Sequence, residues 1–182
     1  MSAMNFIPTP LAGVWLIEPQ RREDERGWFA RTFCEQEFSA RGLIAQWPQC
    51  STSFNAKKGT LRGLHWQAAP HAETKLVRCT RGALWDVVVD LRADSPTFRK
   101  WFATELTPDN GRAHYIPAGC AHGFQTLADD TEVFYQISVP HHSPSARGAR
   151  WNDPAFGIAW PLPCPILSPA DENRVDFSTL AP

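Results

Sequence analysis

Apolar and polar residues alternate along much of the middle of the chain. The clearest example is WDVVVDLR, residues 85–92, and the same period of two recurs in EVFYQI, residues 132–137. Because successive side chains of a strand point to opposite faces, this period predicts β-strands. Other strands are expected at residues 14–18, 27–33, 61–67, 75–82, 100–106 and 114–118.

Turn-forming sequences such as DSP, TPDNG and PAG separate these expected strands. The best candidate for a helix is the short stretch EQEFSARGL, residues 35–43. Many short strands joined by Gly and Pro turns are typical of a β-sandwich or barrel. We therefore expect an all-β jelly roll with short peripheral helices.

The size of the chain predicts one domain over residues 1–182. Of its 182 residues, 43% are hydrophobic and eight are Trp, which is enough for a sizeable core. The C-terminal stretch WNDPAFGIAWPLPCPILSPADENR, residues 151–174, is rich in Pro and Trp but has little repeated pattern. We expect it to pack over the barrel and not to act as a flexible linker.

Charge and cysteine content limit the partners and the cellular location that can be expected. Lys and Arg total 18 against 19 Asp and Glu without charge runs, so neither a nucleic-acid partner nor a polybasic membrane surface is expected. The five cysteines lack a CxxC pair, which argues against a disulfide framework and a thiolate zinc site. No apolar run approaches the ~18 residues that span a bilayer, and no signal peptide is recognisable. A cytoplasmic protein is expected.

Two blocks, GTLRGLHWQ and GRAHYIPAGCAH, have a spacing that resembles the two motifs of the cupin fold, which implies a cupin-type jelly roll. Metal-binding cupins usually carry His, His, Glu and His at four positions that here read His65, Gln67, Lys75 and His122. A divalent cation requires neutral or anionic donors, and an ammonium at the carboxylate position adds the wrong charge. We expect neither a metal nor another cofactor.

Three interpretations of His65 follow from the residues alone: a metal ligand, a catalytic base, or a hydrogen-bonded core histidine. Strand alternation puts His65 and Gln67 on one face, and in a barrel His65, Lys75 and His122 are expected to project into the interior. An inward Lys75 needs an anion or oxyanion to face, whereas the alternative is an exposed strand lysine.

The ordered blocks DERGWF, LRGLH, KLVRC, DVVVDLRADSPTF, IPAGCAHGF, EVFYQ, WNDP and LSPAD cover nearly the whole chain. This series resembles the dTDP-4-dehydrorhamnose 3,5-epimerase family of cupin-fold sugar-nucleotide epimerases. The resemblance implies a metal-free homodimeric isomerase whose substrate is a nucleoside-diphosphate 4-keto-6-deoxyhexose. Such an enzyme inverts C3, C5 or both in deoxysugar biosynthesis, for example from dTDP-4-dehydro-6-deoxyglucose to dTDP-4-dehydrorhamnose.

The resemblance also implies catalytic roles, which match the chemistry of the side chains. His65 is the expected base, and Asp171 is expected to fix its tautomer and stabilise the imidazolium. Lys75, with His122 as a helper, suits the developing charge on the C4 oxygen. Tyr135 matches the family's acid, which returns a proton from the other face, although an inward strand tyrosine can also be simply a core residue.

Arg26 and Arg62 resemble residues of the family that hold the diphosphate, for which guanidinium groups are well suited. Strict alternation, however, puts Arg62 on the face opposite His65. Its role therefore requires a bend or bulge near Gly63.

The residues expected to contact the nucleotide depart from the family pattern. Gln49 matches a nucleotide-contacting Gln, but Ser51 replaces the usual Asn, and Arg147 stands where relatives often carry Glu. A His-His pair replaces a Tyr-Tyr pair that supplies a base-stacking aromatic. His142 can stack on a base, or the pair can lie in an ordinary surface loop. These departures leave the base of the nucleotide open.

Two alternatives to an epimerase remain at the level of sequence. One is a cupin sugar-nucleotide ketoisomerase, which shifts a carbonyl between carbons. The other is a non-catalytic sugar-nucleotide binding protein that has kept the fold, although such a protein has no need to retain all four catalytic candidates.

Overall fold

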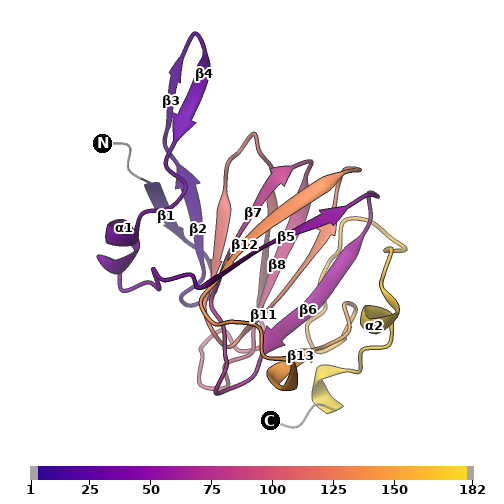
Figure 1. Ribbon diagram of the computed structural model, residues 1–182. Helices are drawn as coiled ribbons and strands as arrows, with labels where there is room; N and C mark the ends of the chain where they lie inside the picture. The colour runs from indigo at the N-terminus through magenta and orange to yellow at the C-terminus, as the bar shows by residue number, and fades with distance from the viewer. Residues whose placement is uncertain (1–3, 180–182) are drawn as a thin grey trace.

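Two antiparallel sheets face each other in the computed structural model, which describes residues 4–179 (Figure 1). The larger sheet has the strand order β1 (Met4–Pro8), β2 (Trp15–Pro19), β10 (Ala113–Ile116), β7 (Lys75–Arg81), β12 (Thr131–Ile137) and β5 (Gln49–Asn55). The smaller sheet has the order β13 (Ala146–Gly148), β6 (Leu61–Gln67), β11 (Cys120–Thr126), β8 (Leu84–Asp90) and β9 (Trp101–Leu106).

A separate hairpin of β3 (Arg21–Asp24) and β4 (Gly27–Ala30) projects from this sandwich at the top of Figure 1. The helices are short: α1 (Glu35–Ser39), α2 (Pro169–Glu172), and 3₁₀ turns at Ser143–Ser145 and Phe177–Thr179. Within residues 4–179, no helix combines the length and apolar composition needed to cross a bilayer. The expected all-β architecture with short peripheral helices is confirmed.

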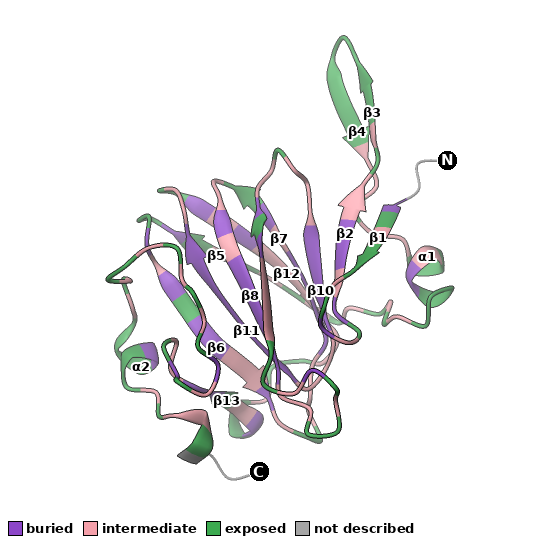
Figure 2. Ribbon diagram, turned by 180° about the vertical axis from the view of Figure 1, so that it is seen from behind, coloured by how far each residue is buried: buried purple, intermediate pink, exposed green. Residues whose placement is uncertain are grey.

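The alternation in β8 illustrates how the sequence builds the sandwich. Val88 belongs to the core between the two sheets, whereas Val87 and Val89 belong to a second apolar cluster on the outer face. Figure 2 shows that the strands of the sandwich are buried over much of their length, whereas the β3–β4 hairpin is exposed. Burial on both faces is possible because other segments cover the outside of each sheet.

The segment around α1 covers the larger sheet, where the fully buried Phe38 packs with Ile17, Leu76 and Tyr115. The C-terminal stretch covers the smaller sheet, and Phe156 packs there with the outward-facing residues of β8. The C-terminal stretch is therefore packed over the sandwich, as expected from its Trp and apolar content.

The strands β1, β3 and β13 were not predicted from the sequence, and three further features of the strands differ from the sequence expectation. β11 carries the block CAHGFQT but is buried along its entire length, so it has no polar face to produce a period of two. β5 is an edge strand rich in small polar residues and lacks an apolar face in its sequence. β4 ends at Ala30, short of the predicted end at residue 33, because only the hairpin pairs with it.

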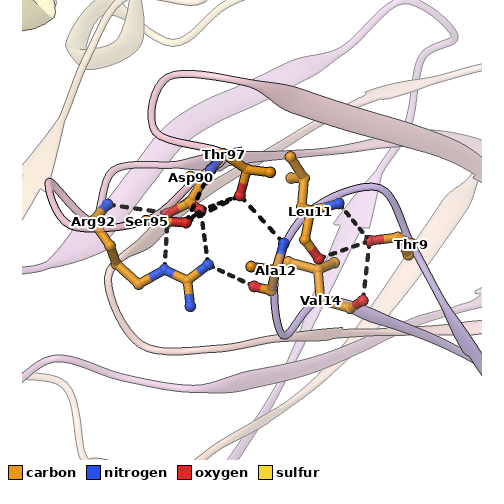
Figure 3. Close-up of polar contacts among 8 residues, drawn as sticks. All are labelled: Thr9, Leu11, Ala12, Val14, Asp90, Arg92, Ser95 and Thr97. Carbon is orange, nitrogen blue, oxygen red and sulfur yellow. Dashed lines mark hydrogen bonds and ion pairs between the residues drawn. The ribbon is translucent and has the colours of Figure 1, made fainter.

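Asp90, at the end of β8, anchors the loop that leads to β9 (Figure 3). Its carboxylate accepts hydrogen bonds from Arg92, Ser95 and Thr97, and Arg92 and Thr97 also bond to the backbone of Ala12. Burial raises the pKa of Asp90, but these donors outweigh it and hold the pKa well below its usual range. The charged carboxylate thus links the loop to the N-terminal segment.

Candidate active site

A cavity of about 380 Å³ lies between the two sheets. β6 and β11 of the smaller sheet contribute His65 and His122 to it, and β7 and β12 of the larger sheet contribute Lys75 and Tyr135. The interior placement expected for His65, Lys75 and His122 is confirmed. Eight residues proposed from the sequence line this cavity: Gln49, Ser51, Arg62, His65, Lys75, His122, Tyr135 and Arg147.

Asp171 lies behind His65 and does not line the cavity itself. Its Oδ1 is 2.6 Å from Nε2 of His65, whose side chain is 40% exposed while that of Asp171 is only 7% exposed. Ser168 caps α2 by accepting a hydrogen bond from the backbone N–H of Asp171 at 3.1 Å, which fixes the start of this short helix. The C-terminal segment therefore delivers a buried carboxylate to the ring of His65.

The charge of Asp171 is favoured by this arrangement. Burial raises the pKa of the carboxyl group, but the hydrogen bond and charge of His65 outweigh it, so that the pKa lies below its usual value. An ionised carboxylate in this place orients the imidazole ring and stabilises its protonated form.

Arg62 reaches the same cavity as His65 because β6 is irregular between them. His65 pairs with His122 and Arg62 with Phe124, so three steps on β6 match two steps on β11. Gly63 lies at this bulge with φ of 125°, and a Cβ there would come within 2.6 Å of Gly123 Cα. The expected bulge near Gly63 is confirmed, and Nε of Arg62 donates to Asn55 Oδ1 at 2.8 Å.

His122 is hydrogen-bonded to the buried carboxylate of Asp86 on the neighbouring strand β8. Nε2 of His122 lies 2.7 Å from Oδ2 of Asp86, and the other oxygen, Oδ1, lies 2.8 Å from Nδ1 of His114. Burial raises the pKa of Asp86, but the two imidazoles outweigh it and lower that pKa. Asp86 and His114 were not predicted as site residues, although Asp86 is an inward polar residue in a largely apolar strand.

Lys75 forms an ion pair with Glu73 inside the cavity. Its Nζ lies 2.7 Å from Glu73 Oε1, and both side chains are largely buried. Sequence reasoning missed Glu73, which stands two residues before Lys75 in the segment that leads into β7. The ammonium group therefore has a carboxylate partner inside the cavity.

Tyr135 lies on the larger sheet, as Lys75 does, and faces His65 and His122 of the smaller sheet. Its hydroxyl lies 3.3 Å from Ser53 Oγ, and its ring meets that of His122 edge-on with centroids 6.2 Å apart. Burial raises the pKa of Tyr135 well above its usual value, so the phenol keeps its proton at neutral pH. The cavity thus has a carboxylate-supported imidazole on one sheet and a protonated phenol on the other.

The cupin metal positions are occupied by groups that already have other partners. The Gln67 side chain donates to His71 O and accepts from the backbone N–H of His142, while Lys75 pairs with Glu73. Within residues 4–179, no group of three or more His, Cys, Asp or Glu side chains is arranged to hold a metal ion. The chemistry that these residues offer is proton transfer.

The remaining candidates lie around the rim or away from it. Gln49 accepts a hydrogen bond from the backbone N–H of His141, which lines the cavity. His142 instead stacks on His71, with ring centroids 3.8 Å apart. Arg26 is in the projecting hairpin, where it pairs with Asp24 and its side chain is 85% exposed, so the described chain does not bring it to the cavity. Arg174 also lines the cavity and was not identified from sequence.

Fold and site together define a cupin-type protein whose interior cavity is equipped for acid–base chemistry. Residues 8–179 match the family model of dTDP-4-dehydrorhamnose 3,5-epimerase. The chain is 43% identical over 181 residues to the dTDP-4-dehydrorhamnose 3,5-epimerase of Sinorhizobium fredii, covering 99% of this chain and 93% of that protein. The chain therefore belongs to the dTDP-4-dehydrorhamnose 3,5-epimerase family, which is a family of isomerases.

Solved structures agree with this assignment. The dTDP-4-dehydrorhamnose 3,5-epimerase of Elizabethkingia anophelis superposes with a TM-score of 0.93 at 38% identity, covering 96% of this chain and 97% of that one. The dTDP-6-deoxy-D-glucose-3,5-epimerase of Legionella pneumophila, solved in complex with dTDP-4-keto-L-rhamnose, superposes with a TM-score of 0.92 at 34% identity. That match covers 98% of this chain and 95% of the Legionella chain.

Proposed function

We propose that the protein epimerises a nucleoside-diphosphate 4-keto-6-deoxyhexose at C3, C5 or both. The conversion of dTDP-4-dehydro-6-deoxyglucose to dTDP-4-dehydrorhamnose is the leading example. The observation that carries the proposal is the placement of His65 and Tyr135 on facing sheets of one cavity, with Asp171 of α2 bonded to His65 from behind. Membership of the family supports the substrate class.

Inversion beside a ketone begins with loss of the proton on the neighbouring carbon. In the proposed mechanism His65 takes this proton, the C–H electron pair forms a C=C bond to C4, and the carbonyl electrons move to oxygen. Asp171 stabilises the imidazolium that results, and such a positioned base contributes about 10²–10⁴ in rate.

The intermediate is an enolate, whose negative charge lies mainly on the C4 oxygen. Lys75 is the proposed donor to that oxygen, and its pairing with Glu73 holds the ammonium group in the cavity before the charge develops. His122 lies beside it on the facing sheet and contributes to the polar lining.

Tyr135 is the proposed acid. It returns a proton to the same carbon from the opposite face, the C=C electron pair takes up this proton, and the ketone reforms with inverted configuration. The raised pKa of Tyr135 supports this role because the phenol is protonated when the enolate forms. Proton exchange with solvent then restores the phenol and the neutral imidazole.

The basic and polar residues at the rim of the cavity are proposed to bind the nucleoside diphosphate part of the substrate. Arg62 and Arg147 line the cavity and are proposed to contact the diphosphate, with Gln49 and Ser51 toward the nucleoside. His142 stacks on His71 and follows His141, which lines the cavity, and it is proposed to contact the base.

A homodimer is the proposed assembly. The hairpin that carries Arg26 projects from the sandwich and exposes Trp28 and Phe29, which are 53% and 69% exposed. Large exposed aromatic side chains favour coverage by another chain. In this proposal Arg26 contacts the diphosphate only in the assembled dimer. Metal independence and a cytoplasmic location are proposed as well, with the free thiols of the five cysteines in support of the latter.

The direct test is incubation with dTDP-4-dehydro-6-deoxyglucose in heavy water, followed by NMR location of deuterium. Label at C3 and C5 in an epimerised product establishes a 3,5-epimerase, and label at one centre establishes a mono-epimerase. A product with its carbonyl moved to another carbon means the ketoisomerase alternative. Binding without any label supports a sugar-nucleotide binding protein and overturns the proposal.

A further inference from the structure

His114 is a fully buried histidine that the proposed reaction does not use. It lies on β10, and its Nδ1 is 2.8 Å from Oδ1 of Asp86, the same carboxylate whose Oδ2 lies 2.7 Å from His122 Nε2. One buried carboxylate therefore connects a ring that lines the cavity with a ring that does not. Among residues 4–179, Nε2 of His114 has no hydrogen-bond partner.

The surroundings of His114 fix its protonation. Its register partners are Leu16 on β2 and Val77 on β7. The rings of His114 and Phe102 pack edge-to-face with their centroids 5.7 Å apart. A proton on Nε2 would lie in this apolar environment without an acceptor, which is costly. His114 therefore carries a proton on Nδ1, from which it donates to Asp86.

His122 has charged and titratable neighbours on four strands. Asp86 on β8 favours its protonated form, whereas Lys75 on β7 opposes it; Tyr135 on β12 and His65 on β6 complete the set. Glu73, which precedes β7, offsets part of the Lys75 charge through its ion pair. The protonation state of His122 thus depends on how much negative charge Asp86 presents at Oδ2.

We propose that His114 is a positioning residue that sets the protonation state of His122 through the carboxylate that the two rings share. A donor on Oδ1 draws charge density away from Oδ2 and weakens the pull of Asp86 on a second proton at His122. His122 is then neutral, with its Nε2–H donated to Asp86 and a lone pair on Nδ1. In the cavity such a ring accepts a hydrogen bond, from a hydroxyl group for example, and leaves the enolate oxygen to Lys75.

The electrostatic environment supports this assignment. Burial lowers the pKa of His122, the charge of Lys75 acts in the same direction, and these influences outweigh Asp86, which raises it. The role of His122 toward a sugar hydroxyl rests on the proposed function, whereas its protonation state does not.

Two variants separate hydrogen bonding from simple packing. His114→Leu fills the space with an apolar side chain but removes the donor, whereas His114→Asn keeps an N–H close to the position of Nδ1. NMR titration of the His122 ring in the full chain reads the effect without any need for turnover. We expect the midpoint of His122 to lie below that of a free histidine in the wild type, to rise by about one pH unit in His114→Leu, and to stay near wild type in His114→Asn.

An unchanged His122 midpoint in a folded His114→Leu protein would overturn the proposal. Circular dichroism establishes whether this variant folds. If it does not, long-range ¹H–¹⁵N spectra of the wild type decide: we expect His114 to carry a proton on Nδ1. A His114 whose only ring proton is on Nε2 contradicts the proposal. A wild-type protein without epimerase activity, whose His122 midpoint still rises in His114→Leu, would overturn the proposed function and leave this proposal standing.

Discussion

Oδ1 of Asp171 lies 2.6 Å from Nε2 of His65, although 106 positions separate the two residues along the chain. His65 is fixed in the middle of β6, and Asp171 is held by the capped helix α2 in the C-terminal segment. The pair therefore exists only when the C-terminal segment is packed on the smaller sheet. Unfolding of that segment would therefore remove the carboxylate partner of His65.

Removing the carboxylate should impair proton abstraction more than substrate binding. Asp171→Asn keeps the shape of the side chain but loses the charge that stabilises the His65 imidazolium, and we expect kcat to fall about 10²–10⁴-fold with little change in KM. Steady-state kinetics measure both parameters. Glu172→Gln is the matched control, because this residue is exposed on the same helix and its loss should leave kcat unchanged. Equal kinetics for Asp171→Asn and wild type would contradict the role of the pair.

Lys75 should act through its positive charge, which stabilises the negative oxygen of the enolate. Lys75→Met keeps an unbranched side chain without an ammonium group, and we expect a fall in kcat of about 10²–10³, as for loss of an oxyanion donor. Glu73→Gln retains an oxygen that can accept from Lys75 Nζ, and it should retain kcat to within about tenfold. A larger loss in Glu73→Gln than in Lys75→Met would reverse these assignments.

Arg62 should act on substrate affinity. We expect Arg62→Ala to raise KM about tenfold or more with a smaller change in kcat, because a charged hydrogen bond to the diphosphate is lost. Arg62→Lys should recover part of the loss, since it restores the charge but not the planar donor pair. Isothermal titration with dTDP separates affinity from turnover. Wild-type affinity in Arg62→Ala would refute the contact.

Asp90 should contribute stability that depends on pH. Its pKa is lowered in the folded protein, so its contribution is fully present above the unfolded value of about 3.9 and is lost as the pH falls toward the lower folded value. We expect Asp90→Asn to lower the free energy of unfolding at pH 7 by about 3 kcal/mol. Urea denaturation should show this difference narrowing below about pH 4.

The exposed Asp94 in the same loop provides the control for Asp90. Asp94→Asn should change the free energy of unfolding by less than about 0.5 kcal/mol. A constant difference between Asp90→Asn and wild type across the acid range would show that the charge of Asp90 is not the cause.

The cavity was predictable from sequence where side chains follow strand alternation. His65, Lys75 and His122 were expected to project inward, and all three line the cavity. Arg62 required the further condition of a bulge near Gly63, which the shifted register of β6 and β11 meets. The motif spacing therefore located much of the site.

Other features depended on information that the alternation does not carry. β11 is buried on both faces, and its sequence accordingly has no polar period. The sharing of Asp86 by His114 and His122 arises from the pairing of β8 and β11 and the facing position of β10, which is a property of the tertiary structure. Arg26 and His142 were proposed from resemblance alone, and the single chain does not bring them into the cavity.

The most direct test of the two-sided mechanism compares His65→Ala and Tyr135→Phe with wild type in heavy water. NMR of the sugar nucleotide measures solvent exchange and configuration at C3 and C5 in one experiment. The account predicts no exchange in His65→Ala, because the base is lost, and exchange without inversion in Tyr135→Phe, because only the acid on the opposite face is lost. Wild-type exchange in His65→Ala, or normal inversion in Tyr135→Phe, would contradict it.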